Sequence, residues 1–273
     1  MLHCIGMRED KTILVTKFGG AALKELENFS RVAEIVLSRK KEFDVVVVVI
    51  SAMWKMTDQL TELAKKVSKS PPKREQDMLL TVGERISMSL LAMVIEDMGE
   101  RAASFTGSQA GIITNCEHSD ASIIDVRPHR LIPHLDGSKF VVVAGFQGVS
   151  QKGDITTLGR GGSDTTAVAL ATALNAKKVE FYKDVDGVYE KDPKYCPEAR
   201  HIPRLSYEEA ISIIESAEKK LLHPRALKMA KDNAIPLEII SFNKSQIKSI
   251  IVSEEISRPS KPIFEVDTLV SKG

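Results

Sequence analysis

Six consecutive β-branched residues, Val45–Ile50, constrain the fold of this chain more than any other stretch. Such a run has no polar side to turn toward water, so it predicts a strand covered on both faces, as in a parallel sheet. Another apolar strand is predicted at Ile13–Phe18, and an amphipathic helix is predicted after each of these two strands. Because strand, loop and helix alternate twice in the first quarter of the chain, the sequence indicates an α/β fold.

Apolar periodicity predicts the remaining elements in the same way. The helix after the first strand should run from Leu23 to Leu37, and a long helix is expected from Glu75 to Asp97. Because glycine costs about 1 kcal/mol in a helix, Gly83 should mark a close approach to a neighbouring element. The helix after the second strand should have an inner stripe of Leu60, Leu63, Ala64 and Val67, and Ser206–Glu209 reads as a capping box. The other predicted strands are Ala102–Phe105, Gly111–Thr114, Ser122–Val126, Phe140–Ala144, Val179–Tyr182, Leu237–Ser241 and Ser249–Val252, and the other predicted helices are Pro128–Leu135, Ala167–Ala176 and Ala226–Asn233.

The composition, with 43% hydrophobic and 27% charged residues, is that of a soluble globular protein. A formal net charge of +1 provides no overall field that would favour nucleic acid or an anionic membrane as a partner. The three cysteines have no spacing typical of a metal site, so we expect reduced thiols, no metal ligands and a cytoplasmic location. Arg8–Lys11 argue against a signal peptide, and Val45–Ile50, the longest wholly apolar run, is too short to span a bilayer.

A glycine-rich stretch, Thr156–Ala167, is the strongest candidate for a binding site. Its glycines allow close approach of the backbone to a ligand, and the helix that follows offers unpaired N–H groups at its first turn. Arg160 adds a planar fork that matches a carboxylate or phosphate. Asp164 could cap the helix, or could orient a lysine or a metal beside a phosphate. The alternative is a glycine-rich connection that ends in an ordinary Ser or Asp cap.

Five loops follow predicted parallel strands, and loops at the carboxyl edge of such a sheet bind ligands. They are 17–20, 51–58, 145–148, 159–164 and 183–194. Lysines or arginines lie on four of them, whereas a P-loop, an intact dinucleotide fingerprint and a nucleophile elbow are all absent from the sequence. Dispersed cations and backbone donors suit phosphoryl transfer, which requires alignment and charge neutralisation rather than a covalent nucleophile.

Seven motifs occur along the chain in the following order: Lys17-Phe18-Gly19-Gly20, Ser51-Ala52-Met53 with Thr57-Asp58, Val82-Gly83-Glu84-Arg85, Gly145-Phe146-Gln147-Gly148, Thr157 to Asp164, Lys183 to Lys194 and Leu222-His223-Pro224-Arg225. These motifs and their order resemble those of the aspartate kinases, a branch of the amino-acid kinase family, and the resemblance runs from about Ile13 to Val252. It implies a three-layer α/β/α sandwich with a mainly parallel central sheet, in which residues 1–153 bind the acceptor and residues 154–254 the nucleotide. It also implies that ATP with Mg²⁺ phosphorylates the side-chain carboxylate of L-aspartate, and that the enzyme is a homodimer.

The same resemblance implies roles for individual residues. Lys17 and the amides of Gly19 and Gly20 would steady the transferring phosphoryl group, and Asp164 would orient that lysine or a metal. Arg160 and Glu84 would hold the α-carboxylate and α-amino group of the acceptor, although Glu84 and Arg85 read equally well as a solvated charge pair. Ser51, Thr57 and Ser163 would line the acceptor or phosphate site, and the nucleotide would be surrounded by Lys183, Asp184, Tyr189, Lys194 and Lys220.

The chain departs from the family pattern at a few of these positions. Ala21 and Ala22 replace hydroxyl residues, Trp54 and Lys55 stand where small residues are usual, and Lys183 replaces a common threonine. We expect residues 255–273 to form a tail without regulatory domains of the ACT type. The first two departures keep open another acidic amino acid as the substrate, and a weakly active regulatory partner of a full-length kinase is a further alternative.

Overall fold

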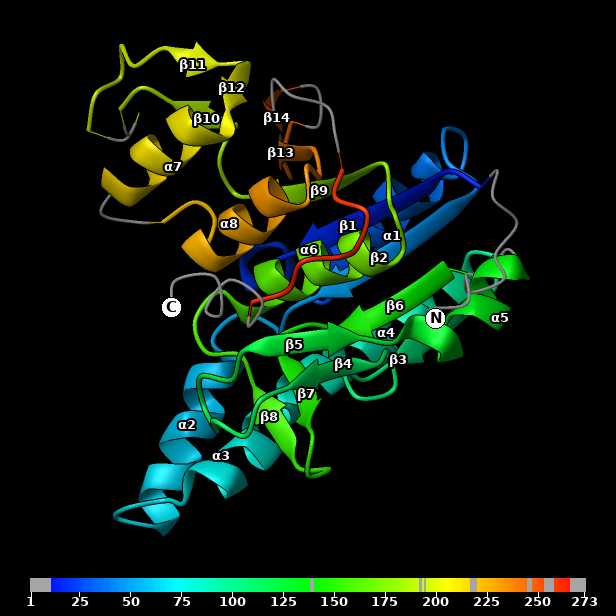
Figure 1. Ribbon diagram of the computed structural model, residues 1–273, viewed down its shortest axis with the longest axis vertical. Coiled ribbons are helices and arrows are strands. Elements are labelled where there is room, and N and C mark those ends of the chain that lie inside the picture. The colour runs from blue at the N-terminus through cyan, green and yellow to red at the C-terminus, as the bar shows by residue number, and fades with distance from the viewer. Residues whose placement is uncertain are drawn as a thin grey trace.

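Eight strands form the central sheet, in the order β12-β14-β13-β9-β1-β2-β6-β3 (Figure 1). The computed structural model describes residues 11–137, 140–191, 193, 195–216, 220–244, 247–252 and 258–265. Neighbouring strands pair in parallel except β13 and β14, so the sheet is mainly parallel, as predicted. The strands are β1 (Ile13–Phe18), β2 (Val45–Ile50), β3 (Ala102–Phe105), β6 (Phe140–Ala144), β9 (Lys178–Lys183), β12 (Arg204–Ser206), β13 (Leu237–Ser241) and β14 (Lys248–Val252).

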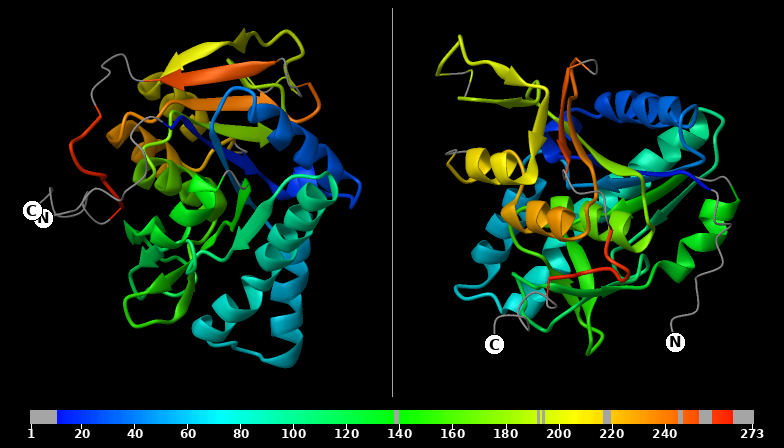
Figure 2. Two further views of the ribbon diagram at one scale, coloured as in Figure 1. Left: turned by 90° about the vertical axis from the view of Figure 1, so that its right-hand side faces the viewer. Right: turned by 45° about the horizontal axis from the view of Figure 1, so that its top comes forward.

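Helices cover both faces of this sheet, which gives the expected α/β/α sandwich. Alternate residues of β1 and β2 enter opposite cores: Val15 and Val47 pack on the side of α6 and α8, and Leu14 packs on the side of α1 and α4. Figure 2 shows these two helix pairs on opposite sides of the sheet. The α6 side holds α5 (Ile132–Asp136), α6 (Gly162–Ala173), α7 (Tyr207–Ser216) and α8 (Pro224–Asp232), and the other side holds α1 (Asn28–Arg39) and α4 (Val82–Asp97).

Two smaller sheets lie outside the central sheet in the described part of the chain. The four-stranded sheet has the order β5-β4-β7-β8, and a hairpin joins β7 to β8. The two-stranded sheet pairs β10 with β11 and has no counterpart in the sequence prediction. The strands are β4 (Ile112–Thr114), β5 (Ile123–Val126), β7 (Gln147–Ser150), β8 (Ile155–Thr157), β10 (Val188–Tyr189) and β11 (His201–Ile202), and two 3-10 turns lie at Gly20–Leu23 and Pro128–Arg130.

Several local predictions are confirmed and others are wrong. The capping box forms, since Ser206 and Glu209 each accept the backbone N–H of the other. Gly83 is a close approach, because a Cβ there would lie 2.8 Å from that of Ala52. The inner stripe of α2 (Met56–Val67) is wrong: this helix has no buried residue, and Val67 is 84% exposed. The loop 159–164 follows β8 of the four-stranded sheet, not a parallel strand of the central sheet.

Helix boundaries also differ from the prediction. The single long helix predicted over Glu75–Asp97 is two helices in the structure, α3 (Lys73–Leu80) and α4, with Thr81 between them. Helix α1 begins at Asn28 rather than Leu23, and α6 begins at Gly162 rather than Ala167. Lys73–Asp97 is long and apolar enough to cross a membrane by length and composition alone, a test that core helices also pass. Here the stretch contains buried acidic side chains and packs Leu91 and Ile95 into the core.

Candidate active site

Three charged side chains meet on the α6 face of the central sheet. Lys17, on β1, places Nζ 2.7 Å from Oδ1 of Asp164, which lies in the first turn of α6. Lys183, at the end of the neighbouring strand β9, places Nζ 3.2 Å from Oδ2 of the same carboxylate. The side chains of Lys17 and Asp164 are each 7% exposed and that of Lys183 is 15% exposed. The structure therefore brings three predicted site residues together as one buried cluster.

The electrostatics of this cluster favour an anion. Burial alone would raise the pKa of Asp164, but the charges of Lys17 and Lys183 outweigh it and lower the pKa to about 2. Burial lowers the pKa of Lys183 to about 8, because Asp164 offsets the desolvation only in part and Lys17 repels it. With Asp164 ionised and both lysines protonated, the cluster holds one excess positive charge away from water. A phosphate oxygen is the kind of group that neutralises such a charge.

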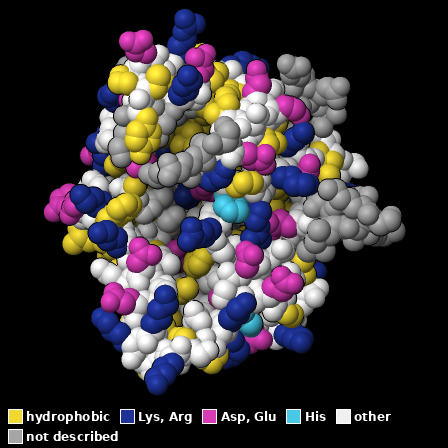
Figure 3. Space-filling view, turned by 90° about the vertical axis from the view of Figure 1, so that its left-hand side faces the viewer, with side chains coloured by type: hydrophobic (Ala, Val, Ile, Leu, Met, Phe, Trp, Pro, Cys, Tyr) yellow, Lys and Arg dark blue, Asp and Glu magenta, His cyan; other side chains and the backbone are white. Residues whose placement is uncertain are grey.

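The turns after β1 and β2 approach each other beside this cluster. A Cβ on Gly20 would lie 2.9 Å from the carbonyl oxygen of Ala52, and one on Gly19 would lie 3.4 Å from Nζ of Lys17. The backbone N–H of Ala52 in turn donates to Glu84 on α4 at 3.1 Å. The carboxyl ends of β1 and β6 point to the left in Figure 1, and the face at that end carries Lys and Arg side chains around a histidine near its middle (Figure 3).

Glu84 is a buried acid rather than part of a solvated charge pair. Its residue is 3% exposed, and burial raises the pKa of its carboxyl to about 7 against the opposing effects of the Ala52 amide and of Lys17. Its Oε2 has no hydrogen-bond partner in the described part of the chain. An unpartnered buried carboxylate oxygen is suited to receive a cationic group of a ligand.

The other residues predicted for the acceptor side are less tightly assembled. Ser51 and Thr57 are partly exposed, at the end of β2 and in the first turn of α2. Ser163 is 7% exposed and packs so closely on Gly145 that a Cβ there would lie 2.7 Å from the serine Cβ. Arg160 is exposed on the turn between β8 and α6.

The residues predicted for the nucleotide are spread over three segments. Asp184 follows Lys183 and is exposed. Tyr189, on β10, contacts His201 edge to face with ring centroids 5.3 Å apart. Lys220 is exposed between α7 and α8 and donates to the carbonyl of Glu215. Lys194 lies outside the described residues.

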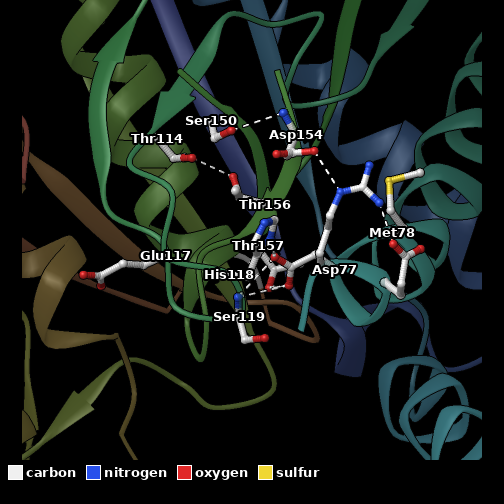
Figure 4. Close-up of polar contacts among 12 residues, drawn as sticks. Asp77, Met78, Thr114, Glu117, His118, Ser119, Ser150, Asp154, Thr156 and Thr157 are labelled. Atoms are coloured by element: carbon white, nitrogen blue, oxygen red, sulfur yellow. Dashed lines mark hydrogen bonds and ion pairs between the residues drawn. The ribbon is translucent and has the colours of Figure 1, made fainter. Parts of the chain in front are cut away.

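A buried carboxylate on α3 was not predicted from the sequence. Asp77 is fully buried, and it accepts hydrogen bonds from the Thr157 hydroxyl at 2.6 Å and the Ser119 amide at 3.1 Å (Figure 4). Nδ1 of His118 lies 2.7 Å from its Oδ2. These contacts tie α3 to β8 just before the glycine-rich turn. The sequence offered little signal for this contact, because Asp77 lies in the polar N-terminal part of α3 beside Glu75 and Gln76 and reads as a surface residue.

Comparisons with known proteins agree with this architecture. A model described as the amino acid kinase family matches residues 12–241. The chain belongs to the amino acid kinase family. It is 51% identical over 240 residues to an aspartokinase of Mycolicibacterium smegmatis, covering 88% of this chain and 57% of that protein. It is 47% identical over 245 residues to an aspartokinase of Geobacillus stearothermophilus, covering 90% and 60%.

Solved structures of this family are similar in fold as well. The aspartate kinase from Synechocystis superposes with a TM-score of 0.79 at 39% identity, over 92% of this chain and 41% of that one. E. coli aspartokinase III in complex with aspartate and ADP has a TM-score of 0.77 at 26% identity, over 89% and 65%. The chain thus spans less than two thirds of the length of these relatives.

Proposed function

We propose that this chain is an aspartate kinase: it phosphorylates the side-chain carboxylate of L-aspartate with ATP, giving 4-phospho-L-aspartate. This would be the first step toward lysine, threonine and methionine. The observation that carries the proposal is the buried Lys17–Asp164–Lys183 cluster, with its excess positive charge at the carboxyl ends of β1 and β9. The high identity to proteins named aspartokinases supports aspartate as the acceptor.

The reaction requires charge neutralisation more than proton transfer. The acceptor carboxylate is ionised at pH 7 and needs no general base. Its approach to a polyphosphate is opposed by repulsion, which Lys17, Lys183 and the amides of Gly19 and Gly20 offset at the transferring group. Asp164 holds both ammonium groups and so positions them in line with that group.

The acceptor would be recognised at both of its α-substituents. The side chain of Glu84 accepts the α-ammonium group, and the guanidinium of Arg160 binds the α-carboxylate through two parallel hydrogen bonds. Ser51, Thr57 and Ser163 line the same pocket. By this proposal residues 1–153 supply most of the acceptor site and residues 154–254 supply the nucleotide site.

The nucleotide would extend from the lysine cluster toward Asp184, Tyr189, Lys194 and Lys220. Both carboxylate oxygens of Asp164 are engaged by ammonium groups. No group of three or more His, Cys, Asp or Glu that could hold a metal occurs among the described residues. We propose that Mg²⁺ enters as part of the nucleotide substrate, held by the phosphates and water, as this ion commonly is.

A second candidate is a kinase for a related acidic amino acid, which two departures favour. Ala21 is partly exposed beside the Gly19–Gly20 turn, and Trp54 is 49% exposed two residues before α2 begins. Ala22 does not contribute to this argument, because it is buried in the core with Leu23.

We also propose a cytoplasmic homodimer. Apolar side chains stand exposed on α2 and α4, among them Leu63, Val67 and Met93, and a dimer contact would remove them from water. Light scattering of the purified chain gives the mass directly, and the mass of a single chain would contradict this part of the proposal.

The test of the activity is trapping of the acyl phosphate with hydroxylamine in the presence of ATP and Mg²⁺, with L-aspartate compared with L-glutamate and with aspartate analogues. Product with L-aspartate alone is the expected result. Product with another acid only would favour the second candidate. No product with any acid, while ATP still binds, would favour a regulatory partner. The Lys17→Ala variant is the control, since it should keep the fold and lose turnover.

A further inference from the structure

Arg225, in the last of the motifs, has no role in the proposed mechanism, yet its guanidinium is fully engaged. An arginine side chain has five N–H donors. Here Nη1 donates to the Leu158 carbonyl at 2.7 Å and to Asp120 at 3.1 Å, and Nη2 donates to the Ala121 carbonyl at 2.6 Å and to Glu265 at 2.9 Å. Nε donates to the other oxygen of Glu265. These hydrogen bonds use every donor of Arg225 and hold three segments in one fixed arrangement: residues 120–121, Leu158 and Glu265.

One of these segments leads directly into the turn that carries Arg160. Leu158 is fully buried and is followed by Gly159, whose φ is +69°. Gly161 has the same φ of +69°, so Arg160 stands between two residues in the left-handed region. Glycine adopts these backbone angles and many others without strain, so the direction of the Arg160 side chain depends on how the two ends of this turn are held.

Both sides of the turn pack against segments that Arg225 organises. A Cβ on Gly159 would lie 2.5 Å from the Asp120 carboxylate, and a Cβ on Gly161 would collide with the ring of His223, two residues before Arg225. The backbone N–H of Ala121 donates to the carbonyl of Thr157 at 2.9 Å. The turn therefore lies between the 119–121 segment and the start of α8. Arg225 is part of α8 and donates hydrogen bonds to the 119–121 segment.

Glu265 connects this arrangement to the segment 258–265. Its side chain is 11% exposed and forms a bidentate pair with Arg225. It also accepts the backbone N–H of Ile123 at 2.6 Å, and its own N–H donates to the carbonyl of Ile123 at 3.1 Å. The segment, drawn in red in Figure 1, crosses α6 toward the start of β5. Asn233, which follows the last residue of α8, fixes this segment further by two hydrogen bonds to Ile263.

We propose that Arg225 is a positioning residue for Arg160, and that Glu265 makes this positioning depend on the docked segment 258–265. The effect on the acid acceptor rests on the proposed function, whereas the effect on the turn does not. With Arg225 in place, the Leu158 carbonyl is fixed and the guanidinium of Arg160 is presented to the α-carboxylate of the acceptor. Without the Glu265 pair, Arg225 loses its orientation and the turn relaxes.

The first measurement is hydrogen exchange of the backbone amides of residues 157–162. In Arg225→Lys, which keeps the charge and loses the fork, exchange of these amides should accelerate about tenfold or more, because charge-assisted hydrogen bonds that hold the turn are removed. Glu265→Gln should have a smaller effect in the same direction. Lys228→Gln is the matched control, since Lys228 lies one turn along α8 and pairs only with Asp232 among the described residues. Unchanged exchange in Arg225→Lys would overturn the proposal, whatever the chain catalyses.

The second measurement separates positioning from general destabilisation. In acyl-phosphate formation, Arg225→Lys should raise the KM for the acid about tenfold while the KM for ATP changes less than about twofold. In an Arg160→Ala background the same substitution should have no further effect on the KM for the acid, because its effect passes through Arg160. Equal increases of both KM values, or an undiminished effect without Arg160, would overturn the proposal. A native chain that forms no acyl phosphate, with faster exchange in the variant, would contradict the proposed function alone.

Discussion

Lys183 should lower the stability of the folded chain, because its charge is held in the buried cluster that we propose as the phosphate site. Its pKa falls from an ordinary 10.5 to about 8, chiefly through burial. Since one pKa unit corresponds to about 1.36 kcal/mol, holding the lysine protonated at pH 7 costs about 3 kcal/mol. Replacement by methionine removes this cost but leaves one oxygen of the buried, ionised Asp164 carboxylate without a partner, a loss of about 2 kcal/mol. We therefore expect Lys183→Met to raise the free energy of unfolding by about 1 kcal/mol at pH 7.

The pH dependence tests the same reasoning independently. A lysine whose pKa is lowered by folding is fully penalised below the folded value, and the penalty disappears as pH rises from about 8 to 10.5. The free energy of unfolding of the variant, relative to that of the native chain, should therefore fall by about 2 kcal/mol between pH 7 and pH 9.5, so that the variant becomes the less stable of the two. Urea unfolding followed by far-ultraviolet circular dichroism at the two pH values measures both quantities. Turnover should fall, because the charge beside the phosphate is lost.

Lys178→Met is the matched control, at the other end of β9. The Lys178 side chain is 17% exposed and lies 2.9 Å from both Glu180 and Glu238. Burial would lower its pKa, but the two carboxylates outweigh burial and raise it. This substitution should therefore destabilise the chain and leave turnover unchanged. If Lys183→Met also destabilises the chain at pH 7, or if its effect is the same at both pH values, the electrostatic account of the cluster is refuted.

Three further substitutions address other parts of the site. Arg160→Lys should raise the KM for the acid more than the KM for ATP, because an ammonium cannot form two parallel hydrogen bonds; equal increases would place Arg160 at the nucleotide. The KM for the acid should fall as pH rises through the Glu84 pKa of about 7, because this carboxyl must ionise to bind an ammonium group. Glu84→Gln should remove this pH dependence of KM. If the dependence persists in the variant, Glu84 is not its origin. Gly145→Ala should lower the free energy of unfolding by about 1–3 kcal/mol, since its Cβ would overlap Ser163; an unchanged urea midpoint would show that α6 can move away.

The central sheet could be predicted because its strands are coded locally. Val45–Ile50 pairs in parallel with β1 on one side and β6 on the other, as an unbroken β-branched run requires. Apolar spacing was a poorer guide to burial in α2, where Leu63 and Val67 face outward. Spacing reports that a helix has an apolar side, and it cannot report whether another element covers that side.

The charged clusters depended on contacts between distant parts of the chain. The resemblance indicated Lys17 and Asp164, but the sharing of Asp164 between Lys17 and Lys183 follows from the adjacency of β1 and β9. The break between α3 and α4 falls at Thr81, a position where no proline or glycine indicates the end of a helix. The guanidinium of Arg225 joins the 120–121 segment, Leu158 and Glu265, and no short motif could have indicated that combination.

The position of β1 between β2 and β9 has a consequence for dividing the chain. Lys17 and Glu84 precede the exposed hairpin turn at 151–153, whereas Arg160, Asp164 and Lys183 follow it. A cut in this turn would give two fragments, the first with two and the second with three of these charged groups, and each with an unpaired edge where β1 meets β9. The protein therefore suits fragment complementation: activity should return only when the two pieces reassociate along that seam, which would make this chain a reporter for the proximity of two fused proteins.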